Sequence, residues 1–250
     1  MTSNDTLIIV PTYNERENLP TLFEQICLAV SDPHILIVDD KSPDGTADLA
    51  EGIFTGREGC SVLRREGRRG LGRSYVDGYG HALQAGYSRV VQMDADLSHD
   101  PKYIPSLIEA AETADVVLGS RYCEGGGVQN WPPHRFFLSR FANRYVAAIT
   151  RLPVKDSTSG FRCYTRRALE KIAIDRIESN GYAFQVEMTY RASEAGLKIA
   201  ESPIVFTDRL QGKSKISRTV LIESMIMPWR LRFAMRRSRA LQPAHRPTDP

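Results

Sequence analysis

The sequence predicts an α/β protein in which a mostly parallel β-sheet is flanked by helices. Three observations support this fold class. Short apolar runs alternate along the chain with longer segments in which apolar residues recur every three or four positions. The runs are continuously apolar, as in strands that are buried on both faces. Prolines or acidic residues end several of them. Strands and helices in alternation form a parallel sheet with right-handed crossovers.

The apolar patterns also place each element along the chain. Predicted strands cover residues 7–10, 35–38, 62–63, 89–93, 116–118 and 198–207. Predicted helices cover residues 19–30, 46–53, 74–86, 101–111, 135–151, 165–173 and 183–195. The regular alternation ends near residue 121, and we expect the second half of the chain to extend the same domain.

Polar segments follow the predicted strands where ligands of such sheets bind, beyond the carboxyl ends of the strands. These segments are Pro11–Glu15, Asp39-Asp40, Asp94–Ser98 and Gly119–Arg121. Every predicted strand end except the third carries an ionisable group. The sequence therefore predicts a catalytic cleft at this edge of the sheet.

Asp94-Ala95-Asp96 is the most informative of these segments. In an extended chain, residues i and i+2 point to the same side, roughly 6.5 Å apart. Two carboxylates placed in this way repel each other unless a cation or protons relieve them. A divalent ion, Mg²⁺ or Mn²⁺, shared with a diphosphate would do so, and Ser98 would add a third oxygen. The alternative is a solvated loop with two unrelated acids.

The first two strand ends are predicted to bind a nucleoside. Tyr13 is suited to stack on a base, and Glu15 or Asp40 to accept hydrogen bonds from base or ribose. Asn14 and Glu15 also suit a helix start. Asp39 taken alone is well explained as an acid in a turn with Asp44 and Gly45, whereas Asp39 and Asp40 together indicate a site role.

Cations supply candidate phosphate ligands. The loop at residues 64–73 holds five arginines and three glycines, which fits a phosphate-binding loop and an exposed basic loop equally well. Its glycine spacing does not match the dinucleotide-binding motif. Arg121, Arg209, Lys213 and Lys215 have no obvious partner in sequence, and a leaving diphosphate or an acceptor phosphate would provide one.

Charge is distributed unevenly along the chain. Residues 209–250 hold ten Lys or Arg against two acids, a net +8, so residues 1–208 carry −5 of the overall +3. Within this end, residues 217–240 interleave apolar and basic side chains, which indicates an amphipathic segment on an anionic membrane. Residues 241–250, with three prolines, are expected to be a disordered tail. Residues 1–216 would then form the catalytic domain.

Several bulk features bear on location. No run of about 18 apolar residues occurs, and the polar residues 1–6 do not form a signal peptide. The four cysteines are widely spaced and lack a metal-binding pattern, so we expect reduced thiols in the cytoplasm. Nucleic acid is a less favoured partner for the basic end, because there is neither a reading helix nor a ladder of stacking aromatics.

The motifs, taken together, resemble those of the dolichol- and polyprenol-phosphate mannose synthases. The resemblance extends in order over residues 7–216. It rests on Pro11–Asn18, Val38–Asp40, Ser42–Thr46, Met93–His99, Gly119–Tyr122, Ser157–Arg162, Gly181–Glu187 and Asp208–Lys215.

This resemblance implies a GT-A fold, the fold of nucleotide-diphospho-sugar transferases. It also implies transfer of mannose, with inversion, from GDP-mannose to a polyprenyl or dolichyl phosphate at the cytoplasmic face of a membrane. Asp94, Asp96 and Arg121 would be the catalytic residues, and Asp94, Asp96 and Ser98 the metal ligands. GDP-mannose would contact Pro11, Tyr13, Glu15, Val38, Asp40, Asp94, Ala95, Asp96, Arg121, Arg209 and Lys215. Some relatives carry Gln at the position of Ser98. Others carry C-terminal membrane helices, which the short basic segment replaces here, and this leaves room for a membrane-anchoring protein partner.

Three alternative functions are also compatible with the sequence. The nearest is a polyprenyl-phosphate glucosyltransferase that uses UDP-glucose. The second is a non-catalytic membrane-associated binding protein with the same fold, against which both metal-type carboxylates argue. The third is a nucleic-acid binder that uses the basic end, which predicts steeply salt-dependent binding.

Overall fold

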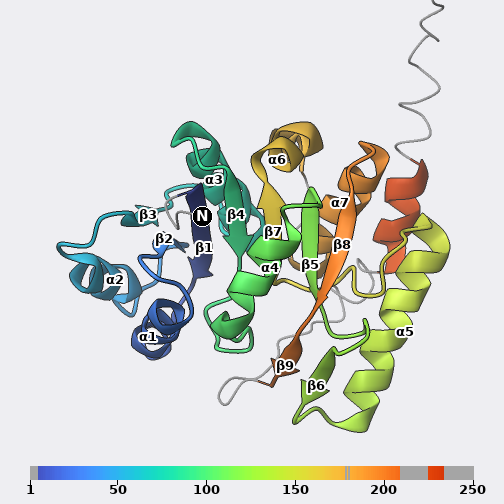
Figure 1. Cartoon of the computed structure of the whole chain (residues 1–250), viewed down its shortest axis with the longest axis horizontal. Coiled ribbons are helices and arrows are strands. Elements are labelled where there is room, and N and C mark those ends of the chain that lie inside the picture. Colours follow the sequence, from blue (N-terminus) through green and yellow to red (C-terminus); the bar gives the residue numbers. More distant parts are fainter. Residues whose placement is uncertain (1–4, 178, 180, 209–224, 234–250) are drawn as a thin grey trace, which may run out of the picture.

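A seven-stranded β-sheet runs through the middle of the computed structural model, which describes residues 5–177, 179, 181–208 and 225–233 (Figure 1). The strand order is β3-β2-β1-β4-β7-β5-β8, and all neighbours are parallel except the two pairs that include β7. These strands are β1 (Thr6–Thr12), β2 (His34–Asp39), β3 (Cys60–Arg64), β4 (Arg89–Gln92), β5 (Val116–Ser120), β7 (Arg162–Thr165) and β8 (Ile199–Pro203). A second, two-stranded parallel sheet consists of β6 (Gly127–Gln129) and β9 (Val205–Thr207).

Helices cover both faces of the main sheet. They are α1 (Leu19–Ala29), α2 (Thr46–Phe54), α3 (Leu71–Gln84), α4 (Ile104–Ala110), α5 (Pro133–Thr150), α6 (Arg166–Ile172) and α7 (Gly181–Glu194). Short 3-10 turns occupy Pro101–Tyr103 and Ile174–Arg176, and residues 225–233 form a further helix. None of the helices in these described ranges is both long and apolar enough to cross a membrane.

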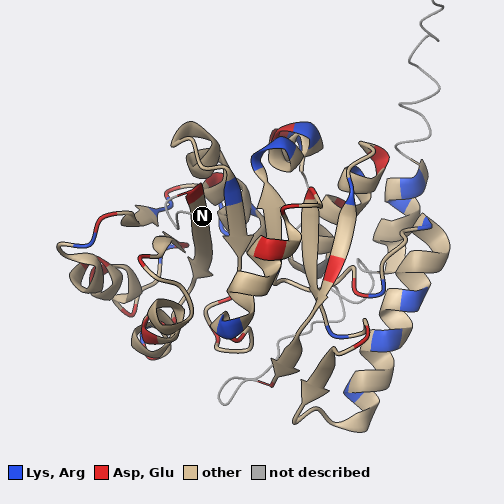
Figure 2. Cartoon of the chain, in the orientation of Figure 1, with Lys and Arg blue, Asp and Glu red and all other residues tan. Residues whose placement is uncertain are grey.

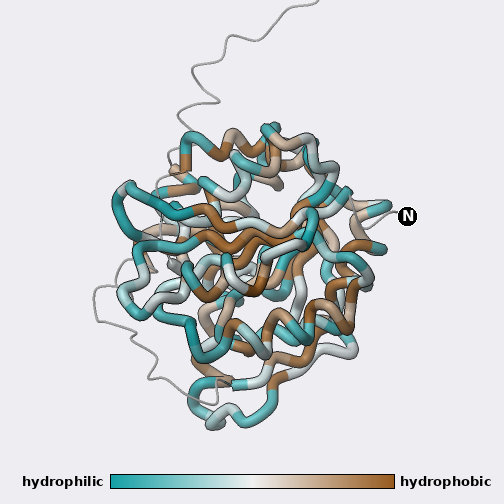
Figure 3. Tube along the Cα trace, turned by 90° about the vertical axis from the view of Figure 1, so that its left-hand side faces the viewer, coloured by the Kyte–Doolittle hydropathy of each residue, from teal (hydrophilic) through white to brown (hydrophobic). Residues whose placement is uncertain are grey.

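Alternate side chains of the buried strands point to opposite faces of the sheet, and they therefore belong to two different hydrophobic cores. On β1, Leu7 and Ile9 face the core formed with α3, α6 and α7, whereas Ile8 and Val10 face the core formed with α1, α2 and α4. Figure 3 shows the hydrophobic strands gathered in the middle of the trace. The continuously apolar runs of the sequence are thus explained by burial on both faces.

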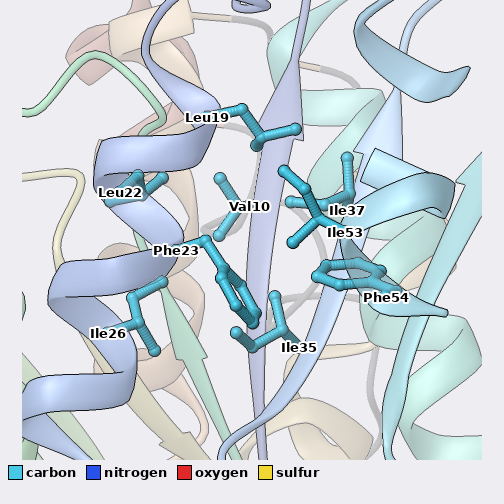
Figure 4. Close-up of a pocket in the computed structure, with 9 residues that line it drawn as sticks. All are labelled: Val10, Leu19, Leu22, Phe23, Ile26, Ile35, Ile37, Ile53 and Phe54. Atoms are coloured by element: carbon cyan, nitrogen blue, oxygen red, sulfur yellow. The ribbon is translucent and has the colours of Figure 1, made fainter. Parts of the chain in front are cut away.

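Apolar side chains between α1 and α2 meet tightly over β1 and β2 (Figure 4). The space left among them is about 10 Å³, close to the smallest volume that holds one water molecule. It is core packing and not a ligand site. The lining residues are Val10, Leu19, Leu22, Phe23, Ile26, Ile35, Ile37, Ile53 and Phe54.

The predicted α/β class with a mostly parallel sheet is confirmed, but the second half of the chain differs from the prediction in detail. β6 and β7 were not predicted. The single strand predicted over residues 198–207 is wrong, because the chain leaves the main sheet after β8 and pairs as β9 with β6. At the break, the Ile204 amide donates to Ser120 O and its carbonyl accepts from Gly127. β7 escaped detection because it is short and begins with a buried arginine, Arg162.

Candidate active site

Parallel pairing brings the predicted strand-end residues to one edge of the sheet. Pro11 and Val38 are register partners, and both are buried. One residue further, Thr12 pairs with Asp39, and the Asp40 amide donates to Thr12 O at 3.0 Å. The Met93 amide donates to Ile9 O at 3.2 Å, which places the segment after β4 beside β1.

Asp94 is held by two buried rings. The Tyr75 hydroxyl from α3 donates to Asp94 Oδ1 at 2.8 Å. Burial raises the pKa of Tyr75 well above its ordinary value, and the nearby Asp94 charge adds to this, so Tyr75 remains a donor. The Asp94 amide donates to His99 Nδ1 at 3.0 Å, which places the proton of a neutral imidazole on Nε2. His99 is buried between Phe161 and Phe206, at centroid distances of 5.1 and 5.6 Å.

Asp96 is supported by Ser98 in a tight local turn. Asp96 Oδ1 accepts from the Ser98 amide at 3.1 Å and from its hydroxyl at 2.5 Å. Leu97 between them adopts the left-handed conformation, with φ of 62°. Since the single Ser98 proton goes to Asp96, Ser98 orients this carboxylate. Its role as a direct metal ligand stays a prediction.

The donor set at this edge fits a divalent ion that a substrate helps to bind. The described part of the chain contains no group of three or more His, Cys, Asp or Glu residues suited to a metal. Asp94 and Asp96 offer carboxylate oxygens, which Mg²⁺ and Mn²⁺ accept. Mg²⁺ is typically bound by one or two carboxylates together with substrate phosphates. The residues therefore fit an ion shared with a diphosphate, and not a resident structural metal.

Asp40 anchors the arginine-rich loop. Its Oδ1 accepts from the Arg65 guanidinium, and its Oδ2 accepts from the Gly70 amide at 2.8 Å. Arg65 is buried, pairs through Nε with Asp77 at 2.6 Å and donates to Arg68 O at 3.2 Å. Neither interpretation of residues 64–73 anticipates Arg65, because its guanidinium is buried and paired with Asp40 and Asp77. It closes the loop over the end of β2.

The other proposed nucleoside ligands differ in their surroundings. Asp39 accepts from the Ser42 amide and hydroxyl, at 3.0 and 2.5 Å, and from the Thr12 hydroxyl at 3.1 Å. It is the buried turn acid expected when Asp39 is taken alone. Glu15 Oε2 accepts from Asn18 Nδ2 at 2.7 Å, just before α1. Tyr13 is exposed, and the Arg69 guanidinium lies 3.6 Å from its ring centroid.

Arg121 has a protein partner that the sequence did not reveal. Its Nε and NH2 groups donate to the two Asp156 oxygens at 2.7 Å each, and NH2 donates to Thr158 Oγ1 at 2.9 Å. Both members of the pair are buried. Burial alone would raise the pKa of Asp156, but the Arg121 charge together with the hydrogen bonds from Arg121 and Thr158 outweighs it, and the pKa of Asp156 is lowered. Arg121 thus has a partner within the protein, and its contact with a donor or acceptor phosphate stays a prediction.

Aromatic residues surround this cation. The Arg121 guanidinium lies 5.3 Å from the Tyr122 ring centroid and 5.5 Å from those of Trp131 and Phe206. Arg135 lies 4.3 Å from the Trp131 ring and pairs with Asp208 at 2.6 Å. Trp131 Nε1 is buried, and none of the described residues forms a hydrogen bond with it.

Sequence reasoning missed Asp156, Trp131 and Arg135, and it did not foresee the burial of Arg65. For Asp156 a signal existed, because it directly precedes the motif Ser157–Arg162. The predicted phosphate ligands Arg209 and Lys215, together with Lys213, lie outside the described residues.

The fold together with a family match defines the class of the protein, a glycosyltransferase of GT-A fold. Residues 7–173 match the model of Glycosyl transferase family 2. The chain is 42% identical over 240 residues to a polyprenol monophosphomannose synthase of Mycolicibacterium smegmatis, covering 94% of this chain and 91% of the relative. It is also 42% identical over 230 residues to an undecaprenyl-phosphate mannosyltransferase of Micrococcus luteus, covering 92% and 95%. The chain therefore belongs to glycosyl transferase family 2 and, within it, to the polyprenol-phosphate mannose synthases.

Solved structures agree on the fold. Glucosyl-3-phosphoglycerate synthase from Mycobacterium tuberculosis, in complex with Mn²⁺, UDP-glucose and phosphoglyceric acid, superposes with a TM-score of 0.64. The match covers 89% of this chain and 79% of that one at 20% identity. At this identity the likeness concerns the fold alone, and it supports the GT-A architecture that the sequence motifs implied.

Proposed function

We propose that this protein transfers mannose, with inversion, from GDP-mannose to a polyprenyl phosphate. The observation that carries the proposal is the 42% identity to a polyprenol monophosphomannose synthase across 94% of the chain. The site geometry supports it, because two oriented carboxylates and a buried arginine share one edge of the sheet.

Each part of the site has a role in this reaction. Pro11, Tyr13, Glu15, Val38 and Asp40 bind the guanosine part, with Asp40 contributing through the loop that it closes. Asp94, Asp96 and Ser98 would hold Mg²⁺ or Mn²⁺, and Ala95 would lie against the diphosphate. The ion, when bound, would neutralise charge on the departing GDP. Arg121, Arg209 and Lys215 contact phosphates of the donor or acceptor.

The acceptor needs little chemical activation. A lipid phosphate is already an anion at neutral pH, so the reaction does not require a general base. His99 is not placed to act as one through Nδ1, because this atom accepts the Asp94 amide hydrogen. The protein's task is to align the phosphate with the anomeric carbon on the face opposite GDP.

A second candidate is glucosyl transfer from UDP-glucose to the same lipid, since a structural neighbour was crystallised with UDP-glucose. The two are separated by incubating the purified protein with a short polyprenyl phosphate and either donor, with Mg²⁺ or Mn²⁺, and identifying the lipid product by mass spectrometry. We expect product with GDP-mannose. Product with UDP-glucose and none with GDP-mannose would reject the mannosyl assignment.

We also propose that the protein sits peripherally on the cytoplasmic face of an anionic membrane. Two neighbouring helices, α5 and residues 225–233, carry the contact. Trp229 Nε1 donates to Tyr145 Oη at 3.0 Å, Tyr145 Oη donates to Met225 O at 2.9 Å, and Met227 and Leu231 join the core. Their outer faces expose seven large apolar side chains: Phe137, Leu138, Phe141, Met225, Ile226, Trp229 and Phe233.

The charge of these helices suits an anionic surface. Neither contains an acidic residue, and together they carry five arginines, at positions 135, 140, 144, 230 and 232. Figure 2 shows basic bands along α5 without acidic ones. Apolar side chains mixed with arginines are typical of helices that lie in a membrane interface. Residues 217–240 would therefore act jointly with α5, with or without a membrane-anchoring protein partner.

A further inference from the structure

A short loop at residues 156–161 connects two parts of the candidate active site. At one end, Asp156 and Thr158 hold the Arg121 guanidinium. At the other end, Gly160 lies against Asp94 and His99. A Cβ added to Gly160 would stand 3.3 Å from Asp94 Oδ2 and 3.2 Å from His99 Cε1. The loop contains most of the motif Ser157–Arg162, to which the proposed reaction assigns no role.

Buried side chains fix this loop from its inner side. Arg162 donates from Nε to Ser159 O and from NH2 to Ser157 O, both at 2.7 Å. Gln92 Nε2 donates to Gly160 O at 2.8 Å. Three carbonyl groups of one short loop are thus held by donors from the interior of the sheet.

Arg162 reaches beyond the loop into the core. It is fully buried, and it also donates to Gln185 O and Thr189 Oγ1 of α7, at 3.0 and 2.9 Å, and to the Tyr164 hydroxyl at 3.2 Å. The acceptors of all these bonds are carbonyl or hydroxyl oxygens. Burying a cation is costly unless its hydrogens are satisfied, and the planar guanidinium offers five N–H donors for these acceptors.

The start of the loop is held as well. Glu201 on β8 accepts from the amides of Lys155 and Asp156, at 3.0 and 2.9 Å. Asn143 on α5 donates to Thr158 Oγ1 at 3.0 Å and accepts from Ser157 Oγ at 3.1 Å. The loop is therefore tied to α5, α7, β4 and β8, and it has little freedom to move Arg121 or to yield at Asp94.

We propose that residues 156–161 form a positioning element that sets the Asp94 carboxylate and the Arg121 guanidinium relative to each other. Arg162 is its buried anchor, and Gly160 is its contact with Asp94. The inference rests on the proposed function, in which Asp94 holds the metal-bound diphosphate and Arg121 contacts a phosphate. Arg162, Thr158 and Gly160 act through these two residues.

Gly160→Ala tests the Asp94 end. Gly160 is not among the glycines with positive φ, so alanine is compatible with the backbone there. Its Cβ would instead push Asp94 and His99 by a few tenths of an ångström. We expect the Mn²⁺ concentration for half-saturation, measured by electron paramagnetic resonance with GDP present, to rise at least tenfold. The melting temperature should stay close to that of the wild-type protein. Gly80→Ala on α3, where a Cβ meets nothing within 4 Å, is the matched control and should titrate like the wild type.

Thr158→Val tests the Arg121 end. The substitution keeps the side-chain shape but removes the oxygen that accepts from Arg121 NH2 at 2.9 Å. We expect kcat/KM for the polyprenyl phosphate to fall at least fivefold, with the Mn²⁺ titration unchanged. If Thr158 contributed only to stability, kcat/KM and the amount of bound Mn²⁺ would fall together, in proportion to the loss of folded protein.

The outcomes separate the two proposals. A wild-type Mn²⁺ titration for Gly160→Ala, or wild-type acceptor kinetics for Thr158→Val, would overturn the positioning role. If the wild-type protein binds Mn²⁺ with GDP but transfers no mannose, the proposed reaction fails, whereas the titration of Gly160→Ala still decides the role of the loop.

Discussion

Asp156→Asn is the substitution whose effect the structure defines most closely. Asp156 is fully buried and receives three hydrogen bonds from Arg121, from its amide at 3.0 Å and from its guanidinium at 2.7 Å twice. Asparagine has nearly the same shape, but it removes the charge and turns an N–H group towards the guanidinium. Arg121 would then remain buried without its counter-ion.

The expected cost follows from this burial. Removing one partner of a buried ion pair costs about 3–5 kcal/mol, and we expect the lower end because one carbonyl oxygen remains. In a domain of this size such a loss lowers the melting temperature by roughly 6–12 °C. Calorimetry and urea unfolding at pH 7 would measure both quantities. Arg121→Met in the Asp156→Asn background should be less destabilised than the sum of the single variants, since no unpaired charge is left.

The pH dependence supplies an independent check. The pKa of Asp156 is lowered on folding from its ordinary value of 3.8. Its charge therefore contributes stability that is complete above about pH 4 and is lost as the pH falls through the lower, folded-state pKa. The difference in free energy of unfolding between wild type and Asp156→Asn should shrink below about pH 4. A variant within about 1 kcal/mol of wild type at pH 7, or a difference that grows in acid, would refute the ion-pair account.

Three further predictions concern other parts of the molecule. Asp96→Asn should abolish transfer dependent on Mg²⁺ or Mn²⁺ while circular dichroism stays unchanged, and full activity would remove the metal assignment. Phe137→Glu with Phe141→Glu should reduce co-sedimentation with anionic vesicles at least tenfold at unchanged melting temperature, because these side chains are 68% and 67% exposed. Leu28→Glu on α1, 81% exposed, is the control and should bind as wild type; equal loss in both would contradict a specific membrane face. Cys163 is buried with its pKa raised to about 12, so iodoacetamide at pH 8 should label it only after unfolding, and mass spectrometry that finds it labelled in the native protein would contradict its burial.

The sequence predicted those parts of the fold that depend on local patterns. β1, β2 and β5 are continuous apolar runs because both faces of each strand are buried, and such runs are visible without any contact information. The strand-end acids followed from the same pattern, because parallel strands end at a common edge. The pairing of Glu201 on β8 with the amides that precede β7 has no such local signature.

The missing parts depend on side chains far apart in sequence. Arg121 and Asp156 are separated by 35 positions, and Asp40 and Arg65 by 25. No periodicity relates such residues, so the sequence alone could not identify the partner of Arg121. β7 was missed for a similar reason, since its first residue, Arg162, is charged and its burial depends on acceptors from α7 and the preceding loop.

The antiparallel strand β7 also determines the width of the site. Gln92 at the end of β4 and Leu118 on β5 both pair with Arg162 on β7, so one strand separates the two. Two strand spacings amount to roughly 10 Å, twice the distance between adjacent strands. The segments that follow β4 and β5 can therefore contact opposite ends of an elongated ligand, and they need not both bind the same phosphate. Because β7 is antiparallel to β4 and β5, its N-terminal end, and not its C-terminal end, lies at this edge. A change in length between α5 and β7 would thus reshape the loop that enters this edge, whereas the separation of β4 and β5 stays the same as long as the strands stay paired.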